Sequence, residues 1–316
     1  MTLKVVYSVG KGGVGKTTCA AALALHTARS RRTLVVSLDP AHNLGDVLSR
    51  ELDDRPREIA GNLWALEVNM VSAIERYLAA SQEQLRQMYG YLKTINLEGY
   101  LDALKLSPGI EEYATLQAME ELLRQAEGEY EMVVFDTPPT GLTLRVLALP
   151  KVSLLWGDRL SRLRCDILDR RHTIERIQGQ RKFVLEGREY ELPVEAKADP
   201  VMRELSSYTE RMGRLMALQS DASCSRVMPV MNPDRLSLFE TKRALETLLQ
   251  LKMTIGPVIV NKVGQRITDS RTVAEIEQEL GRPVRTLPYF DVEPVGLTCL
   301  GQVEELIHFD EWVPKE

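Results

Sequence analysis

One octet near the start of the chain, GKGGVGKT at residues 10–17, constrains the fold more than any other feature. It follows an apolar run at 3–9 and precedes an alanine-rich, helical segment at 16–29. A glycine-rich turn between a strand and a helix lets backbone N–H groups close around phosphate oxygens, and the dipole at the helix N-terminus favours their negative charge. The sequence therefore predicts a nucleotide-binding phosphate loop (P-loop).

The loop contains two lysines where one suffices. Lys16, at its end, should contact the β- and γ-phosphates, and Thr17 should hold Mg²⁺. Lys11, at its start, has no evident task within a single chain: it is either a solvated side chain on a loop or a residue that serves a second copy of the protein. The residues expected around the nucleotide here are Gly10, Lys11, Gly12, Gly13, Val14, Gly15, Lys16, Thr17 and Thr18.

Short apolar runs recur along the chain, with helical periodicity between them. Strands that alternate with helices form mostly parallel sheets that are covered on both faces. We therefore expect an α/β fold with a mostly parallel, twisted sheet. The predicted strands are at 3–9, 33–38, 63–68, 132–135, 226–231, 257–260 and 284–287.

Two blocks interrupt this alternation. Residues 70–127 and 151–220 contain helices and almost no strand, apart from a short hairpin at 182–192 that is expected to turn near Gly187. The 316 residues of the chain exceed the size at which a single core usually stops growing. We expect one P-loop domain over 1–316, with a helical subdomain formed by the two blocks.

The bulk composition excludes several classes of function. A net charge of -5 does not suggest nucleic acid as a partner. No run reaches the ~18 apolar residues of a membrane span. The N-terminus enters a strand-like run directly, so we expect no signal peptide and a soluble, cytoplasmic protein. No zinc is expected, because the four cysteines form no CxxC pair; they are Cys19, Cys165, Cys224 and Cys299.

An aspartate follows the second predicted strand. Asp39, in LDPAHNLGD at 38–46, stands where ligands bind in open α/β sheets. It can orient or deprotonate an attacking water, and we also expect it near Mg²⁺. Asn43 and Asp46 should share its loop, with Asn43 near the nucleotide. The structural alternative is that Asp39 and Pro40 begin a helix, or that Asn43 caps one.

A second aspartate, Asp136, ends the strand predicted at 132–135 and opens the segment DTPPTGLTLR. A carboxylate in this position is expected to hold Mg²⁺ through water. Two prolines and Gly141 follow it. We expect them to form a loop that responds to the γ-phosphate of ATP.

The octet with its second lysine resembles the deviant phosphate loop of a family that includes the MinD and ParA ATPases, the nitrogenase iron protein and the arsenite-pump ATPases. Within that family, DPAHNLGD and DTPPTGLTLR resemble the ArsA-type branch. This branch contains the arsenite-pump ATPase and the targeting ATPase for tail-anchored membrane proteins. Other segments similar to it are SPGIEEY at 107–113, RLSLFETKRALETL at 235–248, VIVNKV at 258–263 and LPYF at 287–290.

The resemblance implies a homodimeric, Mg²⁺-dependent ATPase that converts ATP to ADP and phosphate. Lys11 would reach across the dimer to the partner's nucleotide and stabilise charge on the transferring phosphoryl group, as an arginine finger does. Asn261 would read the adenine edge, because an amide satisfies both a donor and an acceptor. Pro288 would contact the base.

The resemblance leaves three roles open. In the targeting ATPases the helical block binds a hydrophobic helix of a client protein, and this is the role we expect here. The second is the ATPase subunit of an arsenite or anion efflux pump, with a membrane subunit as partner. Against it, the chain has one phosphate loop and its cysteines cannot be matched to a metalloid site. The third is a nucleotide-gated adaptor with negligible turnover, which Lys16, Asp39 and Asp136 argue against.

The helical block has two apolar stripes and a basic face. The stripes either form a groove for a client or simply pack on each other and on the sheet. The arginines form either a solvated helix face or a surface for an acidic partner or membrane headgroups. The first stripe comprises Leu160, Leu163, Ile167, Ile174 and Ile177, the second Val201, Leu205, Tyr208, Met212 and Leu215, and the basic face Arg159, Arg162, Arg164, Arg170, Arg171 and Arg176.

Overall fold

The structure is a computed structural model in which the chain divides into two compact units. Unit 1 contains Met1–Ala73, Thr115–Leu147 and Ala217–Glu316, and unit 2 contains Ile74–Ala114 and Ala148–Met216. The helical blocks expected from the sequence overlap unit 2, although most of α5 (Ile110–Ala126) belongs to unit 1. The described residues are 3–41, 43–88, 107–179, 182–185, 188–264 and 272–315.

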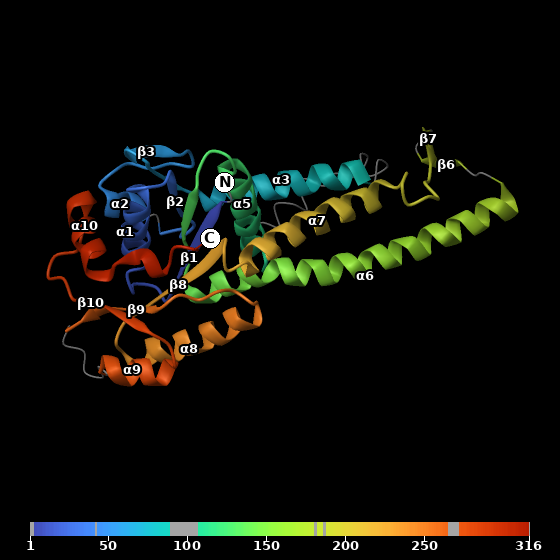
Figure 1. Ribbon diagram of the computed structural model, residues 1–316. Coiled ribbons are helices and arrows are strands. Elements are labelled where there is room, and N and C mark those ends of the chain that lie inside the picture. The colour runs from blue at the N-terminus through green and yellow to red at the C-terminus, as the bar shows by residue number, and fades with distance from the viewer. Residues whose placement is uncertain are drawn as a thin grey trace. The chain divides into compact units, whose positions relative to one another are not determined.

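Unit 1 is built around an eight-stranded sheet with the order β10-β9-β8-β1-β5-β2-β4-β3 (Figure 1). Neighbouring strands pair in parallel, except β3 and β4, which are antiparallel. The predicted α/β fold with a mostly parallel sheet is therefore confirmed. The strands are β1 (Lys4–Val9), β2 (Thr33–Ser37), β3 (Arg57–Ala60), β4 (Leu63–Glu67), β5 (Met132–Asp136), β8 (Ser225–Met231), β9 (Val258–Val263) and β10 (Val284–Pro288).

The edge strand β3 is not among the predicted strands. Of its residues only Ile59 is buried, so it lacks the continuous apolar run of a strand that is buried on both faces. Its sequence signal is instead the dipeptide Gly61-Asn62, which joins Ala60 to its partner Leu63 in a two-residue hairpin.

The central strands end together at one edge of the sheet. Asp136 of β5 lies opposite Ser8 of β1 and Ser37 of β2 in the register of the pairs. The phosphate loop after β1, the Asp39 loop after β2 and the loop after β5 therefore meet at one place. This is the edge at which open α/β sheets bind their ligands.

Helices cover both faces of this sheet (Figure 1). On one face, α1 (Lys16–Ala28) packs against the strands together with α2 (Leu44–Leu48) and α10 (Gly296–Ile307). Residues 19–24 of α1 are fully buried, and most of them are alanines, whose small side chains let the helix lie close to the sheet. On the other face lie α8 (Arg235–Gln250) and α9 (Val273–Leu280).

A polar cluster holds α10 beside α1. His26 Nδ1 lies 3.0 Å from Glu304 Oε1, and Arg29 donates to the other oxygen of that carboxylate over 2.7 Å. Glu304 is buried, so these two partners offset the cost of its desolvation. The neighbouring Val303 lines the pocket described below, and the cluster therefore fixes one wall of that pocket.

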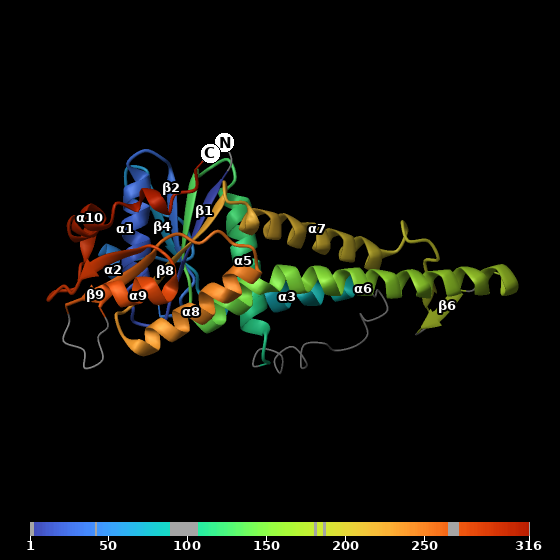
Figure 2. The same ribbon diagram turned by 60° about the horizontal axis from the view of Figure 1, so that its bottom comes forward.

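Among its described residues, unit 2 has helices and one hairpin (Figure 2). Its main helices are α3 (Met70–Met88), α6 (Thr140–Gln178) and α7 (Pro200–Ser220), each of which has one end in unit 1. The hairpin pairs β6 (Lys182–Leu185) with β7 (Arg188–Glu191) in the antiparallel sense, as predicted, while Gly187 lies outside the described residues. None of the helices among the described residues combines the length and apolar character that a membrane crossing requires.

Side-chain contacts join α6 to α7. Arg164 donates to both oxygens of the buried Asp199 over 3.1 and 2.7 Å, and the hydroxyls of Ser153 and Tyr208 lie 2.8 Å apart. Arg164 thus has a structural partner, and not the solvated position that its place in the basic face suggests.

The two apolar stripes of unit 2 differ in exposure. The α7 stripe packs inside the unit, as an amphipathic helix does. The α6 stripe mostly faces solvent. The buried members on α7 are Val201, Met212 and Leu215, and the exposed members on α6 are Leu160, Leu163, Ile174 and Ile177.

Candidate nucleotide-binding site

The phosphate loop joins β1 to α1, and two of its glycines, Gly10 and Gly15, have no room for a side chain. A Cβ on Gly10 would lie 2.2 Å from the carbonyl oxygen of Val230, and one on Gly15 would lie 2.3 Å from Asn261 Nδ2. Gly13 and Gly15 also have positive φ angles of 77° and 92°, which glycine adopts without strain. The strand, loop and helix follow one another in the predicted order.

The two lysines of the loop have different partners. Lys16 is 4% exposed, lines the adjoining pocket and donates to the backbone carbonyl of Lys11 over 3.3 Å. The ammonium of Lys11 lies 3.8 Å from Glu240 Oε2 on α8, and 42% of its side chain is exposed. Lys11 is not among the residues that line the pocket. The geometry therefore places Lys16 at the site of its own chain and Lys11 outside it.

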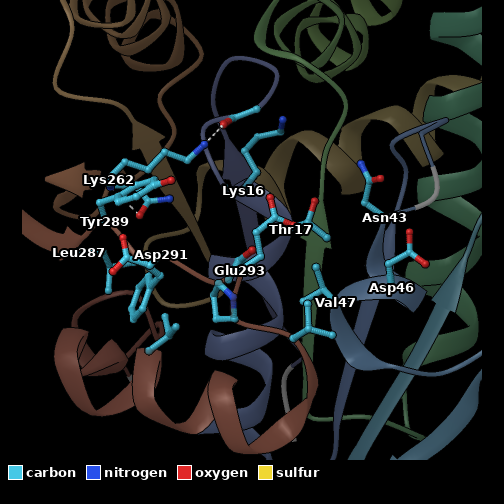
Figure 3. Close-up of a pocket in the computed structure, with 18 of the residues that line it drawn as sticks. Lys16, Thr17, Asn43, Asp46, Val47, Lys262, Leu287, Tyr289, Asp291 and Glu293 are labelled. Carbon is cyan, nitrogen blue, oxygen red and sulfur yellow. Dashed lines mark hydrogen bonds between the residues drawn. The ribbon is translucent and has the colours of Figure 1, made fainter. Parts of the chain in front are cut away.

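A pocket of about 490 Å³ opens beside the phosphate loop (Figure 3). Three parts of unit 1 line it: the loop with the start of α1, the segment after β2, and the ends of β9 and β10 with the residues that follow β10. The predicted site residues that the pocket brings together are Gly13, Gly15, Lys16, Thr17, Thr18, Asp39, Asn43 and Asn261.

Five residues predicted to surround the nucleotide do not line this pocket: Gly10, Lys11, Gly12, Val14 and Pro288. Pro288 is exposed, whereas both of its neighbours, Leu287 and Tyr289, are lining residues. Successive residues of a strand point to opposite faces, so the phase of β10 decides which of them faces the pocket. The contact of Pro288 with the base stays a prediction.

The segment after β10 supplies further lining residues. Phe290 ends the LPYF segment that the sequence already singles out. Asp291, Glu293 and Lys262 also line the pocket (Figure 3), as does Val295, and these four are not among the predicted site residues. Their available signal is position, because they lie at or after the carboxyl ends of parallel strands, where ligands bind.

The loop after β2 holds Asp39 at the pocket through its own backbone. The carboxylate accepts from Ala41 N over 3.1 Å, as aspartates do in turns. The alternative that Asp39 and Pro40 begin a helix is wrong, because α2 starts at Leu44. Asn43 occupies the N-cap position, but its side chain makes no capping bond and lies at the pocket instead (Figure 3).

The loop after β5 is shorter than predicted. Because α6 begins at Thr140, Gly141 lies in its first turn and not in the loop. Both prolines precede the helix, and the Pro139 carbonyl accepts hydrogen bonds from the N–H groups of Leu142 and Thr143 in its first turn. The Thr140 N–H donates to the carbonyl of Gly10 over 3.2 Å, so the start of α6 is tied to the phosphate loop.

Asp136 ends β5 beneath the phosphate loop and is fully buried. Burial raises the pKa of its carboxyl to about 7, and the negative charge of Asp39 adds to this effect. The Thr17 hydroxyl, the charge of Lys16 and the Ser37 hydroxyl act in the opposite direction. The Oδ1 atom is buried without a hydrogen-bond partner among the described residues, which is costly unless a further group meets it.

These side chains fit Mg²⁺, which prefers oxygen ligands and usually keeps several waters. Thr17 supplies a hydroxyl, Asp136 an unpaired carboxylate oxygen and Asp39 a second carboxylate at the pocket. In the part of the chain that the structure describes, no group of three or more His, Cys, Asp or Glu side chains could hold a metal by itself. A cation here would therefore depend on the phosphates of a nucleotide for further ligands.

Replacing Asp136 with asparagine is expected to stabilise the nucleotide-free protein more at pH 8 than at pH 5. The pKa of this carboxyl is about 7 when folded and has its ordinary value of 3.8 when unfolded, so the wild-type protein loses stability as the pH rises between these values. Asparagine does not titrate, so the advantage of the variant should grow by about 1–3 kcal/mol between the two pH values. Chemical unfolding at pH 5 and at pH 8 measures the difference in the free energy of unfolding between the variant and the wild type. The same difference at both pH values would contradict the raised pKa.

Comparison with known proteins agrees with this geometry. The family described as "Anion-transporting ATPase" (ArsA ATPase) matches residues 3–308. The chain is 32% identical to "ATPase GET3" of Ajellomyces dermatitidis over 83% of this chain and 73% of that protein. It is 30% identical to "ATPase ASNA1 homolog 1" of Paramecium tetraurelia over 83% of this chain and 75% of that protein. The chain therefore belongs to the ArsA family of ATP-hydrolysing enzymes.

Proposed function

We propose that this ATPase acts as a Mg²⁺-dependent homodimer that holds and releases hydrophobic helices of membrane proteins, as in the targeting of tail-anchored proteins. Hydrolysis of ATP follows from membership of the family. The dimer, the metal ion and the client are the proposal. The observation that supports the client is the exposed apolar stripe on α6.

The residues at the pocket suit ATP hydrolysis. Lys16 would exchange the Lys11 carbonyl for the β- and γ-phosphates. Thr17 and Asp136 would hold Mg²⁺, which when bound neutralises charge on the phosphates. Asp39 would orient the water that attacks the γ-phosphate and accept its proton.

The helix α6 offers a route from the nucleotide to the client. Its first residue, Thr140, donates to Gly10 of the phosphate loop, and the exposed stripe lies farther along the same helix. Loss of the γ-phosphate would change the contacts of the loop, and with them the hydrogen bond that holds the start of α6.

The α6 stripe has the spacing and length of a surface that binds another helix. Its members recur every three or four residues or at multiples of that spacing, which is the pattern of a seam between two helices. Leu163, Ile174 and Ile177 are 56%, 52% and 76% exposed. From Trp156 to Ile177 the helix rises about 32 Å, close to the ~30 Å apolar core of a bilayer. This length includes Trp156, which is exposed and lies four residues before the stripe of Leu160, Leu163, Ile167, Ile174 and Ile177.

Co-expression with a tail-anchored protein tests this function. The wild-type protein should keep the client soluble. Replacing Leu163 and Ile177 with glutamate should reduce the recovered client about fivefold or more, because a carboxylate in an apolar interface is costly, while ATP hydrolysis continues. The control, Thr173→Glu, adds one such charge to an exposed position of α6 outside the stripe and should recover wild-type amounts. A wild-type protein that hydrolyses ATP but leaves the client aggregated would contradict the targeting role.

A second candidate function is the ATPase subunit of an anion or arsenite pump, which the description of the family favours. It requires arsenite to raise the rate of ATP hydrolysis and cysteine-to-serine changes to abolish that rise, because thiolates are the soft ligands that a metalloid needs. All four cysteines are free thiols. We expect arsenite to leave the rate unchanged, and the same assay therefore separates the two functions.

A further inference from the structure

Two consecutive residues at the end of β9 hold two consecutive carbonyls of the phosphate loop. Asn261 Nδ2 donates to the Val14 carbonyl over 2.8 Å, and Lys262 Nζ donates to the Gly13 carbonyl over 2.9 Å. Both side chains also line the nucleotide pocket, where Figure 3 shows the lysine reaching the loop from the side of Tyr289. The end of β9 thus meets the loop through polar contacts as well as packing.

The backbone of Lys262 is in an unfavourable conformation. Its φ angle is 58°, in the left-handed region that glycine occupies without strain and other residues occupy at a cost. Its N–H donates to Asn261 Oδ1 over 2.8 Å, which fixes the amide of that neighbour. Strain of this kind persists where the surrounding structure requires it, and it is concentrated at functional sites. A glycine would fit this backbone better, so a role for the lysine must come from its side chain.

The contact with Gly13 determines the direction of a neighbouring N–H group. In a planar trans peptide, the C=O of one residue and the N–H of the next point in opposite directions. A hydrogen bond from Lys262 to the Gly13 carbonyl therefore turns the Val14 N–H to the other side, and Asn261 does the same for the Gly15 N–H through the Val14 carbonyl. Successive N–H groups turned to one side form a concave site for an anion.

The glycines of the loop offer little other restraint at this point. A Cβ on Gly12 or Gly13 would meet nothing within 4 Å, so no atom restrains these residues on the side where a side chain would stand. The φ angle of Gly13 is 77°, a region in which glycine is free to move to alternatives. Without the ammonium of Lys262, the peptide between Gly13 and Val14 could rotate and turn its N–H away from the phosphates.

We propose that Lys262 is a positioning residue for the phosphate loop, which turns the Val14 N–H toward the β-phosphate of a bound adenine nucleotide by holding the Gly13 carbonyl. Its effect is on the affinity for nucleotides that have a β-phosphate. It acts through the loop and not by touching the γ-phosphate or the base. The proposal rests on ATP binding at this pocket, and it does not depend on the client or on the dimer.

The experiment measures the dissociation constants of ATP, ADP and AMP by calorimetry in three variants. Lys262→Met keeps a side chain of similar length and removes the ammonium. The dissociation constants of ATP and of ADP should rise by the same factor of about ten, because a hydrogen bond from a charged donor is lost. AMP, which has no β-phosphate, should bind with unchanged affinity. Lys262→Arg keeps a charged donor and should regain most of the lost affinity.

A third variant separates this role from a purely structural one. Lys262→Gly relieves the positive φ angle, so its melting temperature without nucleotide should equal or exceed that of the wild type, while its affinity for ADP falls as in Lys262→Met. A structural role would lower the melting temperature and the affinity together, and it would overturn the proposal.

The other outcomes also discriminate. A larger loss of affinity for ATP than for ADP would show a direct contact with the γ-phosphate. An equal loss of affinity for AMP would show a contact with the base. Either result overturns the proposal, as does an unchanged affinity for ADP. Failure of the wild-type protein to bind ATP would instead contradict the proposed function itself. The two failures are therefore distinguishable.

Discussion

Asp39→Asn is expected to abolish ATP hydrolysis while ATP still binds. Asp39 lines the pocket together with Lys16 and Thr17. Its carboxylate is the group that we propose takes a proton from the attacking water. The amide has the same shape but cannot accept that proton, and the loss of a general base costs about 10²–10⁴ in rate. Lys16 and the loop amides still hold the phosphates. Single-turnover release of phosphate measures the rate, and titration with a non-hydrolysable ATP analogue measures the affinity.

A matched substitution controls for the change of charge. Asp54→Asn replaces an exposed aspartate outside the pocket and should hydrolyse ATP at the wild-type rate. Asp39→Asn should also lower the pKa of Asp136, because the Asp39 charge adds to the effect of burial on that group. If the variant retains more than about a tenth of the wild-type rate, Asp39 is not the general base.

The predicted site residues that meet at the pocket do so for local reasons. The phosphate loop lies between a buried strand and a helix that begins at Lys16, and both are evident from composition alone. Asp39 and Asp136 follow apolar runs, and the parallel pairing of those runs brings their ends to one edge of the sheet. Local pattern and the geometry of parallel sheets together therefore suffice to bring the phosphate loop and Asp39 to one pocket.

The part of the pocket formed by β9 and β10 depends on contacts between distant segments. Nothing in VIVNKV indicates that Lys262 reaches back to Gly13, because that contact requires the packing of β9 beside the loop. The register of β10 shifts between Thr286 and Pro288, and this shift helps to decide which of its residues face the pocket. Periodicity identifies a strand here but does not give the irregularity, so Tyr289 is missed as a lining residue.

The same limit applies to the helices of unit 2. The stripes on α6 and α7 have similar periodicity, yet Met212 is buried and Ile177 is exposed. Periodicity shows that a face is apolar, but whether a partner within the chain covers it depends on the tertiary packing. The exposed stripe is an observation of the structure, and the client proposal depends on it.

Lys11→Ala is expected to bind ATP normally and to hydrolyse it about a thousandfold more slowly, the lower end of the effect of an arginine finger. In its own chain the Lys11 side chain lies near Glu240 and does not line the pocket, so its loss should leave binding unaffected. A role in catalysis then requires a second subunit that presents Lys11 to a nucleotide on the partner. Lys11→Arg keeps the charge and should retain more activity than Lys11→Ala.

Mixing two inactive variants tests the action of Lys11 across the dimer. A heterodimer of Lys11→Ala and Asp39→Asn subunits contains one pocket with its own Asp39 and with Lys11 from the partner. An equal mixture should therefore regain about a quarter of the wild-type activity, because half of the randomly formed dimers have one complete site of two. Different affinity tags on the two variants allow the heterodimer to be isolated and assayed alone. If the isolated heterodimer remains inactive, Lys11 does not act in the partner's site, and the second lysine of the loop must serve its own chain.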